Sequence, residues 1–240
     1  MISNATTSRN CWSILESYWH NTAMAAVLSF WAGNFNSLSS IAILFERSTH
    51  VSGRIADIGI DLVLMPIGAF FVATIWISFV LGSYLAGLLL PKLGLTRSLI
   101  LQSIYVFIAA LVVAAGVSAD AASDYGISKA IMAFILPLAM GFQNSVTTQL
   151  PLERTTHWTG ASTDLGIALS KGSYPLAIFI CIKIFSFILG AAFMAYLIGV
   201  VNIAPYIGLL FISGGLILTT IAGDRINKRV STKTNMKFSQ

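Results

Sequence analysis

Six long apolar runs, separated by short polar segments, constrain this chain of 240 residues more than any other feature. A helix rises about 1.5 Å per residue, so about 20 apolar residues cross the hydrocarbon core of a bilayer. Each run is close to that length or longer, and the sequence therefore predicts six membrane spans. The runs are Ala23–Phe45, Leu64–Leu90, Leu99–Val117, Ile131–Leu150, Leu176–Val201 and Ala204–Ala222.

The composition of the chain agrees with this reading. Hydrophobic residues make up 56% of it and charged residues only 10%, with a mean hydropathy of +0.83. Soluble domains carry about 25% charged residues. The period-two alternation of membrane strands is absent, so the backbone hydrogen bonds of each span must be satisfied within helices. We predict an all-α membrane protein whose first partner is the lipid bilayer.

The distribution of Lys and Arg predicts the orientation of the spans. With six spans both termini lie on one side, and that side would carry ten Lys and Arg residues against three on the other. Cytoplasmic loops are the ones enriched in Lys and Arg, so we expect both termini in the cytoplasm and the protein in the cytoplasmic (inner) membrane. The one basic residue inside a span is Lys183.

The two terminal segments are polar. Residues 1–21 show no secretory signal, and within them Asn10–His20 is predicted to be either a short interfacial helix or a frayed tail. Residues 224–240 form a basic cytoplasmic tail, which would be attracted to anionic lipid. Nucleic acid is excluded as a partner because no folded basic module is present. Cys11 and Cys181 match neither a disulfide framework nor a metal spacing.

The chain contains an internal duplication. ERSTHVSGRIADIGI at Glu46–Ile60 and ERTTHWTGASTDLGI at Glu153–Ile167 are identical at eight of fifteen positions, with an offset of 107. Upstream, GNFNS at 33–37 matches GFQNS at 141–145, and downstream FVLG at 79–82 matches FILG at 187–190. Self-similarity at a fixed spacing indicates two copies of one unit.

Each copy contains three predicted spans, which is an odd number. The second copy would therefore enter the membrane from the opposite side, as a 3+3 inverted-topology repeat with a pseudo-two-fold axis in the membrane plane. The expected units are residues 22–118 and residues 119–223, and the two ERSTH-type segments would lie on opposite faces of the membrane.

GFQNS followed by TTHWTGASTDLGIAL resembles the signature of the YoaK-like family of bacterial membrane proteins. That signature is a G-x-Q-N-[AS] helix and a T-x-x-T-G-x-x-T-D-L-G turn, with a weaker version in the first half. The resemblance covers roughly residues 22–225 and implies a polytopic cytoplasmic-membrane protein. It supplies no reaction or substrate, because the family is one of unknown function. Gly53-Arg54 departs from the Gly-Asn expected in the first copy.

The two polar segments admit two interpretations. As architecture, each is an interfacial turn that starts a short helix through Asp57 or Asp164, with its Glu and His four positions apart on one helical turn. As function, each is a gate loop, since charged groups that recur in a membrane protein are functional by default. The functional interpretation is the one that accounts for the recurring charges. The candidate gate residues are Glu46, Arg47, His50, Asp57, Glu153, Arg154, His157 and Asp164.

Polar residues within the spans form the second group of candidates. Asn36 and Asn144 correspond in the repeat, and with Gln143 they either line a path between the repeats or join helices by amide hydrogen bonds. Lys183 either extends to the cytoplasmic interface or pairs with an acidic group inside the bundle, for which Glu153 and Asp164 are the candidates.

No hydrolase, metalloprotease or P-loop motif is present, so we expect no enzymatic activity, no cofactor and no metal site. The repeat with matched polar breaks is typical of secondary transporters, in which one half rocks against the other. We therefore predict a small transporter or permeation protein for a small polar or anionic solute, or for protons. A membrane scaffold that binds a protein partner is the alternative, and a homo-oligomer is compatible with both.

Overall fold

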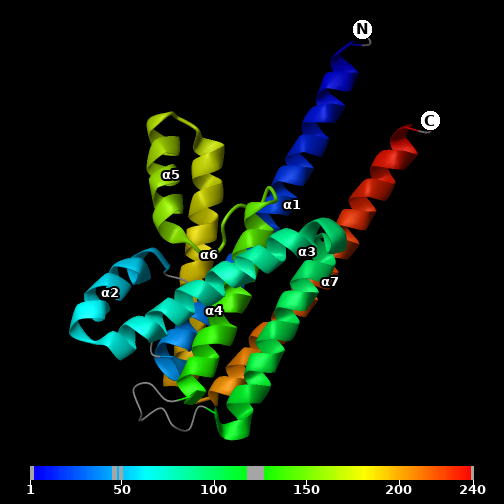
Figure 1. Cartoon of the computed structure of the whole chain (residues 1–240). Coiled ribbons are helices and arrows are strands. Elements are labelled where there is room, and N and C mark those ends of the chain that lie inside the picture. The colour runs from blue at the N-terminus through cyan, green and yellow to red at the C-terminus, as the bar shows by residue number, and fades with distance from the viewer. Residues whose placement is uncertain (1–2, 45–47, 49–50, 118–126, 239–240) are drawn as a thin grey trace.

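The computed structural model describes residues 3–44, 48, 51–117 and 127–238, and every regular element within them is helical (Figure 1). Seven α-helices and two short π-helical segments (η) follow one another along the chain. They are α1 (Ser3–Leu38), η1 (Ser39–Ile43), α2 (Val51–Leu64), α3 (Pro66–Val112), η2 (Val113–Val117), α4 (Ile127–Thr148), α5 (Trp158–Ser170), α6 (Tyr174–Gly199) and α7 (Pro205–Phe238).

Four helical stretches in the described part of the chain are long and apolar enough to cross a membrane. They are Pro66–Ala115, Lys129–Thr148, Tyr174–Gly199 and Pro205–Ile226. The first is 50 residues long and holds two of the predicted spans. The two are separated at Gly94, which interrupts α3 with a φ of 72° and a ψ of 174°. Figure 1 shows the two limbs of α3, before and after this residue, running in different directions. The protein is thus an all-helical membrane protein, and the count of six spans stays a prediction.

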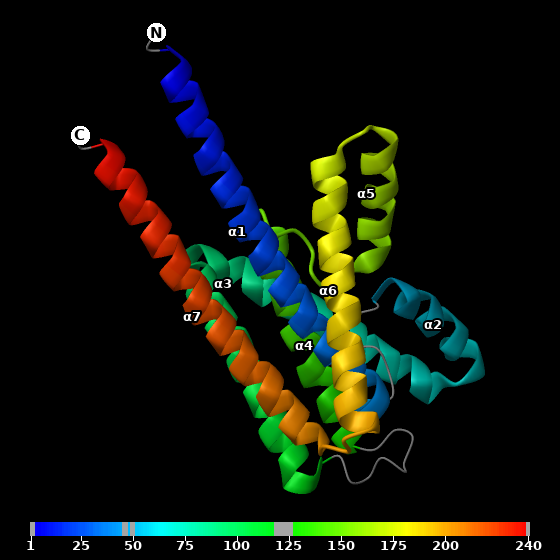
Figure 2. The same cartoon turned by 180° about the vertical axis from the view of Figure 1, so that it is seen from behind.

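The predicted first span, Ala23–Phe45, falls on α1 and η1 as far as the structure describes it, and is not among the four. Polar residues such as Asn34 and Asn36 lower the hydropathy of this stretch. The N-terminal segment predicted as an interfacial helix or a tail is helical from Ser3 and continues in α1 into the first predicted span. The basic tail likewise continues α7 as helix to Phe238. Both chain ends lie at the same end of the molecule (Figures 1 and 2).

Two helix pairs approach each other very closely at glycines that correspond in the repeat. A Cβ atom on Gly33 of α1 would overlap the carbonyl oxygen of Phe187 in α6, and one on Gly141 of α4 would overlap that of Phe79 in α3. Glycine is required at such close approaches. Gly141 lies 108 positions after Gly33, and Phe79 lies 108 positions before Phe187. The two contacts therefore join equivalent residues of the repeat, with the roles of the two halves exchanged. Figure 2 shows α1 and α6 side by side in the lower part of the view.

A second pair of contacts follows the same rule. Gly82 of α3 meets the carbonyl oxygen of Leu138 in α4, and Gly190 of α6 meets that of Phe30 in α1. The break at Gly94 also has a counterpart 108 positions later at Asn202, with a φ of 59° between α6 and α7. Asparagine is one of the few residues that tolerate this conformation. The long helices α1, α3, α4, α6 and α7 therefore each make their most extensive contacts with a helix of the other half, whereas α2 and α5 lie against α3 and α6 of their own half.

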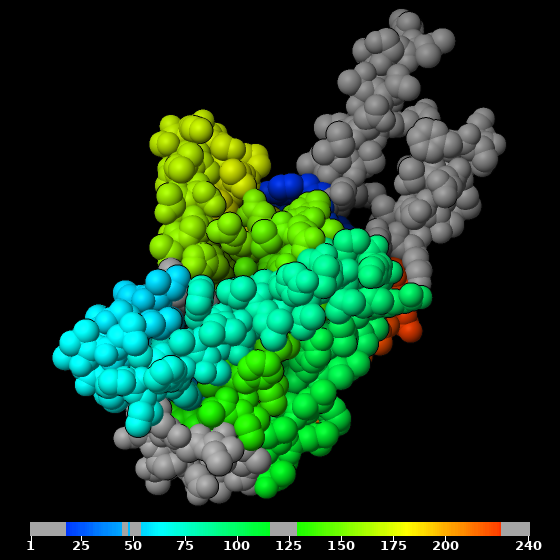
Figure 3. Space-filling model, viewed as in Figure 1, coloured from blue at the N-terminus to red at the C-terminus, as the bar shows by residue number. Residues whose placement is uncertain are grey.

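The two polar segments lead into two short helices, α2 and α5, whose first residues are 107 positions apart. These are the short helices expected through Asp57 and Asp164. No side-chain hydrogen bond caps α5, whose N-cap residue is His157. Figure 3 shows α2 and α5 as two separate projections, with the first limb of α3 crossing the face between them. In the most apolar window of α4 67% of the residues are buried, against 28% in α6, so α4 is central and α6 faces outward.

Candidate functional site

The segment between α4 and α5 turns back against the helix that precedes it. After α4 ends at Thr148, Glu153 takes a left-handed backbone conformation with a φ of 55°. The segment is not helical there, so Glu153 and His157 do not share the helical turn expected from their spacing. Thr155 and Thr156 are 0% and 1% exposed, which places them inside the protein. Residues 153–157, which include the motif TTH, thus form an anchored strap on α4 rather than a solvated loop.

Gln143 holds this strap with its side-chain amide. Its Nε2 donates to the Leu28 carbonyl oxygen and to Thr155 Oγ1, both at 3.1 Å, and its Oε1 accepts a hydrogen bond from Gln102 Nε2. Gln143 is fully buried. An amide whose donors and acceptor are all engaged holds structure together, so these contacts favour the helix-joining interpretation for Gln143.

Asn144, the next residue of α4, occupies a different environment. It is half-buried, and its Oδ1 accepts a hydrogen bond of 2.8 Å from Thr156 Oγ1. Thr147 and Thr148 donate to its carbonyl oxygen. No hydrogen bond from the Asn144 Nδ2 group is present among the described residues. The strap therefore fixes the orientation of the Asn144 amide and leaves its nitrogen available.

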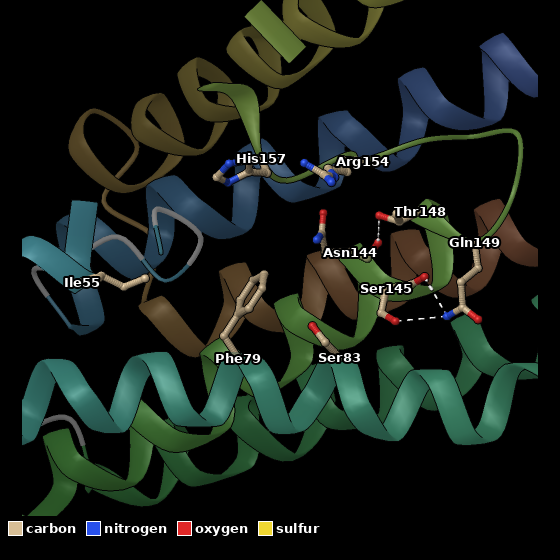
Figure 4. A pocket seen from close by; sticks show the side chains of 9 residues that line it. All are labelled: Ile55, Phe79, Ser83, Asn144, Ser145, Thr148, Gln149, Arg154 and His157. Atoms are coloured by element: carbon tan, nitrogen blue, oxygen red, sulfur yellow. Dashed lines mark hydrogen bonds between the residues drawn. The ribbon is translucent and has the colours of Figure 1, made fainter. Parts of the chain in front are cut away.

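Asn144, Arg154 and His157 line one cavity of about 440 Å³ (Figure 4). Figure 4 shows Arg154 and His157 on the strap, facing Phe79 and Ser83 of α3 across the space, with Asn144 between them. The cavity thus combines polar groups of the second half with an apolar wall from the first half. The other lining residues are Ile55, Ser145, Thr148 and Gln149.

One fixed charge lies among the described residues that line the cavity. Arg154 is exposed and belongs to neither of the ion pairs found in the described part of the chain, and none of the described lining residues is Asp or Glu. Burial, and then the positive charge of Arg154, lower the pKa of His157 below its usual value. His157 is consequently neutral at pH 7, and the described lining residues together carry a single positive charge.

Lys183 lies on α6 behind the strap and pairs with Glu153, one of the two partners that the sequence suggested. Its Nζ is 2.8 Å from Glu153 Oε2 and donates to the carbonyl oxygen of Arg154 at 3.4 Å. The same ammonium group lies 4.5 Å from the centre of the Phe179 ring. Lys183 is 1% exposed, so it does not extend into open water. It holds the strap by one side chain and one backbone group.

Asp164 of α5 lies away from His157, at a second cavity of about 240 Å³ that Glu153, Lys171 and Ile180 also line. The structure therefore separates the four second-half gate candidates. Arg154 and His157 face one cavity, and Glu153 and Asp164 face the other. Among the described residues, no group of three or more His, Cys, Asp and Glu side chains gathers as a metal site would require.

Three of the first-half gate candidates, Glu46, Arg47 and His50, lie outside the described residues. The fourth, Asp57, pairs with Arg54 at 3.2 Å between Oδ2 and Nη1. Arg54 is the residue that departs from the family pattern, so its side chain here has an ion-pair role.

Asn36 does not line the 440 Å³ cavity, and its carbonyl oxygen accepts a hydrogen bond from Ser40. Sequence reasoning missed Gln102, whose amide joins the network of Gln143. A glutamine within an apolar run was the available signal. Phe79 and Ser83, which form the opposite wall, carried no such signal, because an isolated Phe or Ser in a span usually serves helix packing.

A family model described as a protein of unknown function, DUF1275, matches residues 24–223. The chain belongs to the DUF1275 family. This confirms the YoaK-like resemblance, and the match covers both copies of the polar motif and every residue that lines the cavity. No curated protein and no solved structure matches the chain. DUF1275 membership brings no reaction or substrate.

Proposed function

We propose that this protein is a small secondary transporter or permeation protein, with its solute site in the cavity between α3, α4 and the strap. The observation that carries the proposal is the convergence of Asn144, Arg154 and His157 on one cavity of about 440 Å³. Binding pockets for small molecules are clefts of about 300–1,000 Å³ with a few convergent polar groups on apolar walls.

The architecture proposed with it has six transmembrane helices in a 3+3 inverted-topology repeat, with both termini in the cytoplasm. Its support is the recurrence of helix contacts at a spacing of 108 residues, which pairs α1 with α6 and α4 with α3. The position of both chain ends at one end of the molecule also agrees with an even number of spans. In this arrangement the strap would form the inner gate, and Glu46, Arg47, His50 and Asp57 would belong to the outer gate.

Flux through proteoliposomes tests the function. A panel of small carboxylates, amino acids, sugars, phosphate and protons would be offered to the reconstituted protein. We expect Asn144→Leu and His157→Ala to lower the flux of the transported solute about tenfold or more, since each removes a polar contact in the cavity. Arg225→Gln, an exposed site on α7, is the control and should retain flux. Equal flux from both cavity variants and the wild type would contradict the proposal. Absence of any flux, together with one stoichiometric co-purifying protein, would favour the scaffold alternative.

Reporter fusions test the topology. A reporter that is active only in the cytoplasm, fused after residue 240, should be active. A reporter that is active only outside the cytoplasmic membrane should be active when it is fused after residue 122, in the predicted loop between the two halves. The opposite pattern at either position would overturn the proposed orientation.

A further inference from the structure

Some hydrogen-bonding groups of the 440 Å³ cavity are bonded within the protein and others are not. The groups that are not bonded indicate the kind of ligand that the cavity holds. Ser83 Oγ donates to the Gly141 carbonyl oxygen at 3.0 Å, and Thr148 Oγ1 donates to the Asn144 carbonyl oxygen at 2.6 Å. Gln149 Nε2 donates to both oxygens of Ser145 at 3.1 Å. These donors are used within the protein.

The donors that remain among the described residues are the Arg154 guanidinium group, the Asn144 Nδ2 group, the ring N–H of His157 and the Ser145 hydroxyl, and of these only Arg154 carries a fixed charge. The strap fixes the amide of Asn144 and the backbone of Arg154. Thr156 holds the amide of Asn144 by its oxygen, and Lys183 binds the backbone carbonyl of Arg154. A fixed amide donor beside a guanidinium group is an arrangement that binds an oxyanion. Guanidinium in particular matches the two oxygens of a carboxylate.

The charge of the described lining residues favours a ligand with a single negative charge. Among them Arg154 is the one fixed charge and none is acidic, and neutral His157 contributes a further hydrogen-bonding group but no charge at pH 7. A monoanion matches the charge of Arg154, whereas a dianion would leave one of its charges without a charged partner among these residues.

The wall opposite the donors is apolar. Phe79 of α3 and Ile55 of α2 face the space across which Arg154 and His157 lie (Figure 4). A ligand with only a charged group would leave this wall in contact with water or empty. A short hydrocarbon chain would cover it and gain about 0.8 kcal/mol per buried CH₂.

The geometry points to a small organic monocarboxylate as the ligand of this cavity. Its carboxylate lies between the Arg154 guanidinium and the Asn144 Nδ2 group, and its carbon chain lies against Phe79 and Ile55. This inference rests on the proposed function in that it names the solute class of the same site. Phosphate on a lipid headgroup shares the oxyanion chemistry, and the experiment separates the two sources.

The test uses the full-length protein in phosphatidylcholine nanodiscs and calorimetric titration with acetate, butanoate and hexanoate. Hexanamide and inorganic phosphate serve as ligand controls. We expect saturable binding that strengthens from acetate to hexanoate, with hexanamide at least about tenfold weaker because hydrogen bonds to charged groups are the strong ones. Equal binding of hexanoate and hexanamide would overturn the inference.

Variants assign the site. Arg154→Gln should weaken hexanoate binding by about 10- to 100-fold, and Arg154→Lys should lose less, because it keeps the charge and loses the bidentate geometry. Asn144→Asp keeps an oxygen for Thr156 and places a negative charge beside the ligand, so it should abolish binding. Arg97→Gln, an exposed arginine that does not line the cavity, should bind as the wild type does. Full affinity in Arg154→Gln would overturn the assignment.

Two further results separate this inference from its alternatives. If hexanoate does not bind, while native mass spectrometry shows a phosphatidylglycerol retained by the wild type and lost from Arg154→Gln, the site holds a lipid phosphate and the inference is wrong. If hexanoate binds as expected and no solute crosses proteoliposomes, the binding site stands and the proposed transport fails. If a non-carboxylate solute crosses in an Asn144-dependent manner without hexanoate binding, transport stands and the carboxylate assignment fails.

Discussion

Lys183 and Glu153, 30 positions apart in the sequence, form an ion pair of 2.8 Å in which the lysine is 1% exposed and the glutamate 49%. The two residues therefore differ in their exposure to water. Water screens the carboxylate, whereas the ammonium group depends on its protein partners, since a charge buried without a partner is expensive.

This inequality predicts different costs for removing the two partners. Glu153→Gln leaves the buried ammonium without its carboxylate and should lower the free energy of unfolding by about 1–3 kcal/mol, less than for a fully buried pair because Glu153 is half exposed. Lys183→Met removes the buried charge and should cost less than about 1 kcal/mol. Thermal unfolding of the purified protein in detergent measures both. A larger loss for Lys183→Met would contradict this account of the pair.

His157 should make the protein less stable in acid. Its folded pKa lies below the unfolded value of about 6.5, so the unfolded chain binds more protons as the pH falls through that range. The stability is present above the unfolded pKa and is lost on acidification toward the folded pKa. Melting temperatures from pH 7.5 to pH 5 should fall less steeply in His157→Gln than in the wild type. Identical slopes would show that His157 does not titrate as inferred.

Gln143 lies in α4 and Gln149 in the turn that directly follows it, and substitution by leucine should affect the two differently. Gln143→Leu deprives Thr155, Gln102 and the Leu28 carbonyl oxygen of their buried partner and should cost at least about 2 kcal/mol. Gln149 is exposed and bonds only to Ser145, so Gln149→Leu should stay within about 0.5 kcal/mol. Chemical denaturation gives both values, and comparable costs would remove the argument for a structural role of Gln143.

The close helix contacts predict equal effects in the two halves. Gly33→Ala and Gly141→Ala each place a methyl group on a backbone carbonyl of the other half and should each cost about 1–3 kcal/mol or more. Gly87→Ala, at an exposed helical position with nothing within 4 Å, is the matched control and should be neutral or stabilising by up to about 1 kcal/mol. Melting temperatures that fall for only one of the two contact glycines would contradict equivalent packing.

Long apolar runs predicted the positions of α4, α6 and α7 to within a few residues at most ends, because lipid leaves a span little choice but to be helical. The repeat also pointed to the α2 and α5 helices. Neither signal could show that α3 holds two of the predicted spans, because the break at Gly94 is a single backbone conformation. Nor could they show that α1 and α7 continue as helix into the polar termini, where composition is a weak guide.

In the site, the sequence pointed to the polar residues but could not sort them. Gln143 and Asn144 are neighbours in one helix, and the sequence gives no reason for the first to be enclosed and the second to face a cavity. That division follows from the strap, whose two threonines contact one amide each. The partner of Lys183 was easier to predict, because a lysine in a span needs an acidic or carbonyl partner and the sequence offered few acidic candidates.

The crossed pairing of α1 with α6 and of α4 with α3 has a consequence for biosynthesis. When the ribosome has completed the first half, Gly33 faces no partner, because Phe187 has not yet been made. The first three predicted spans must therefore wait in the bilayer until α6 arrives, and contacts between residues so far apart in the chain form slowly. Neither half has its own complete set of neighbours, so the two halves expressed as separate chains should each be degraded alone and accumulate only when they are made together.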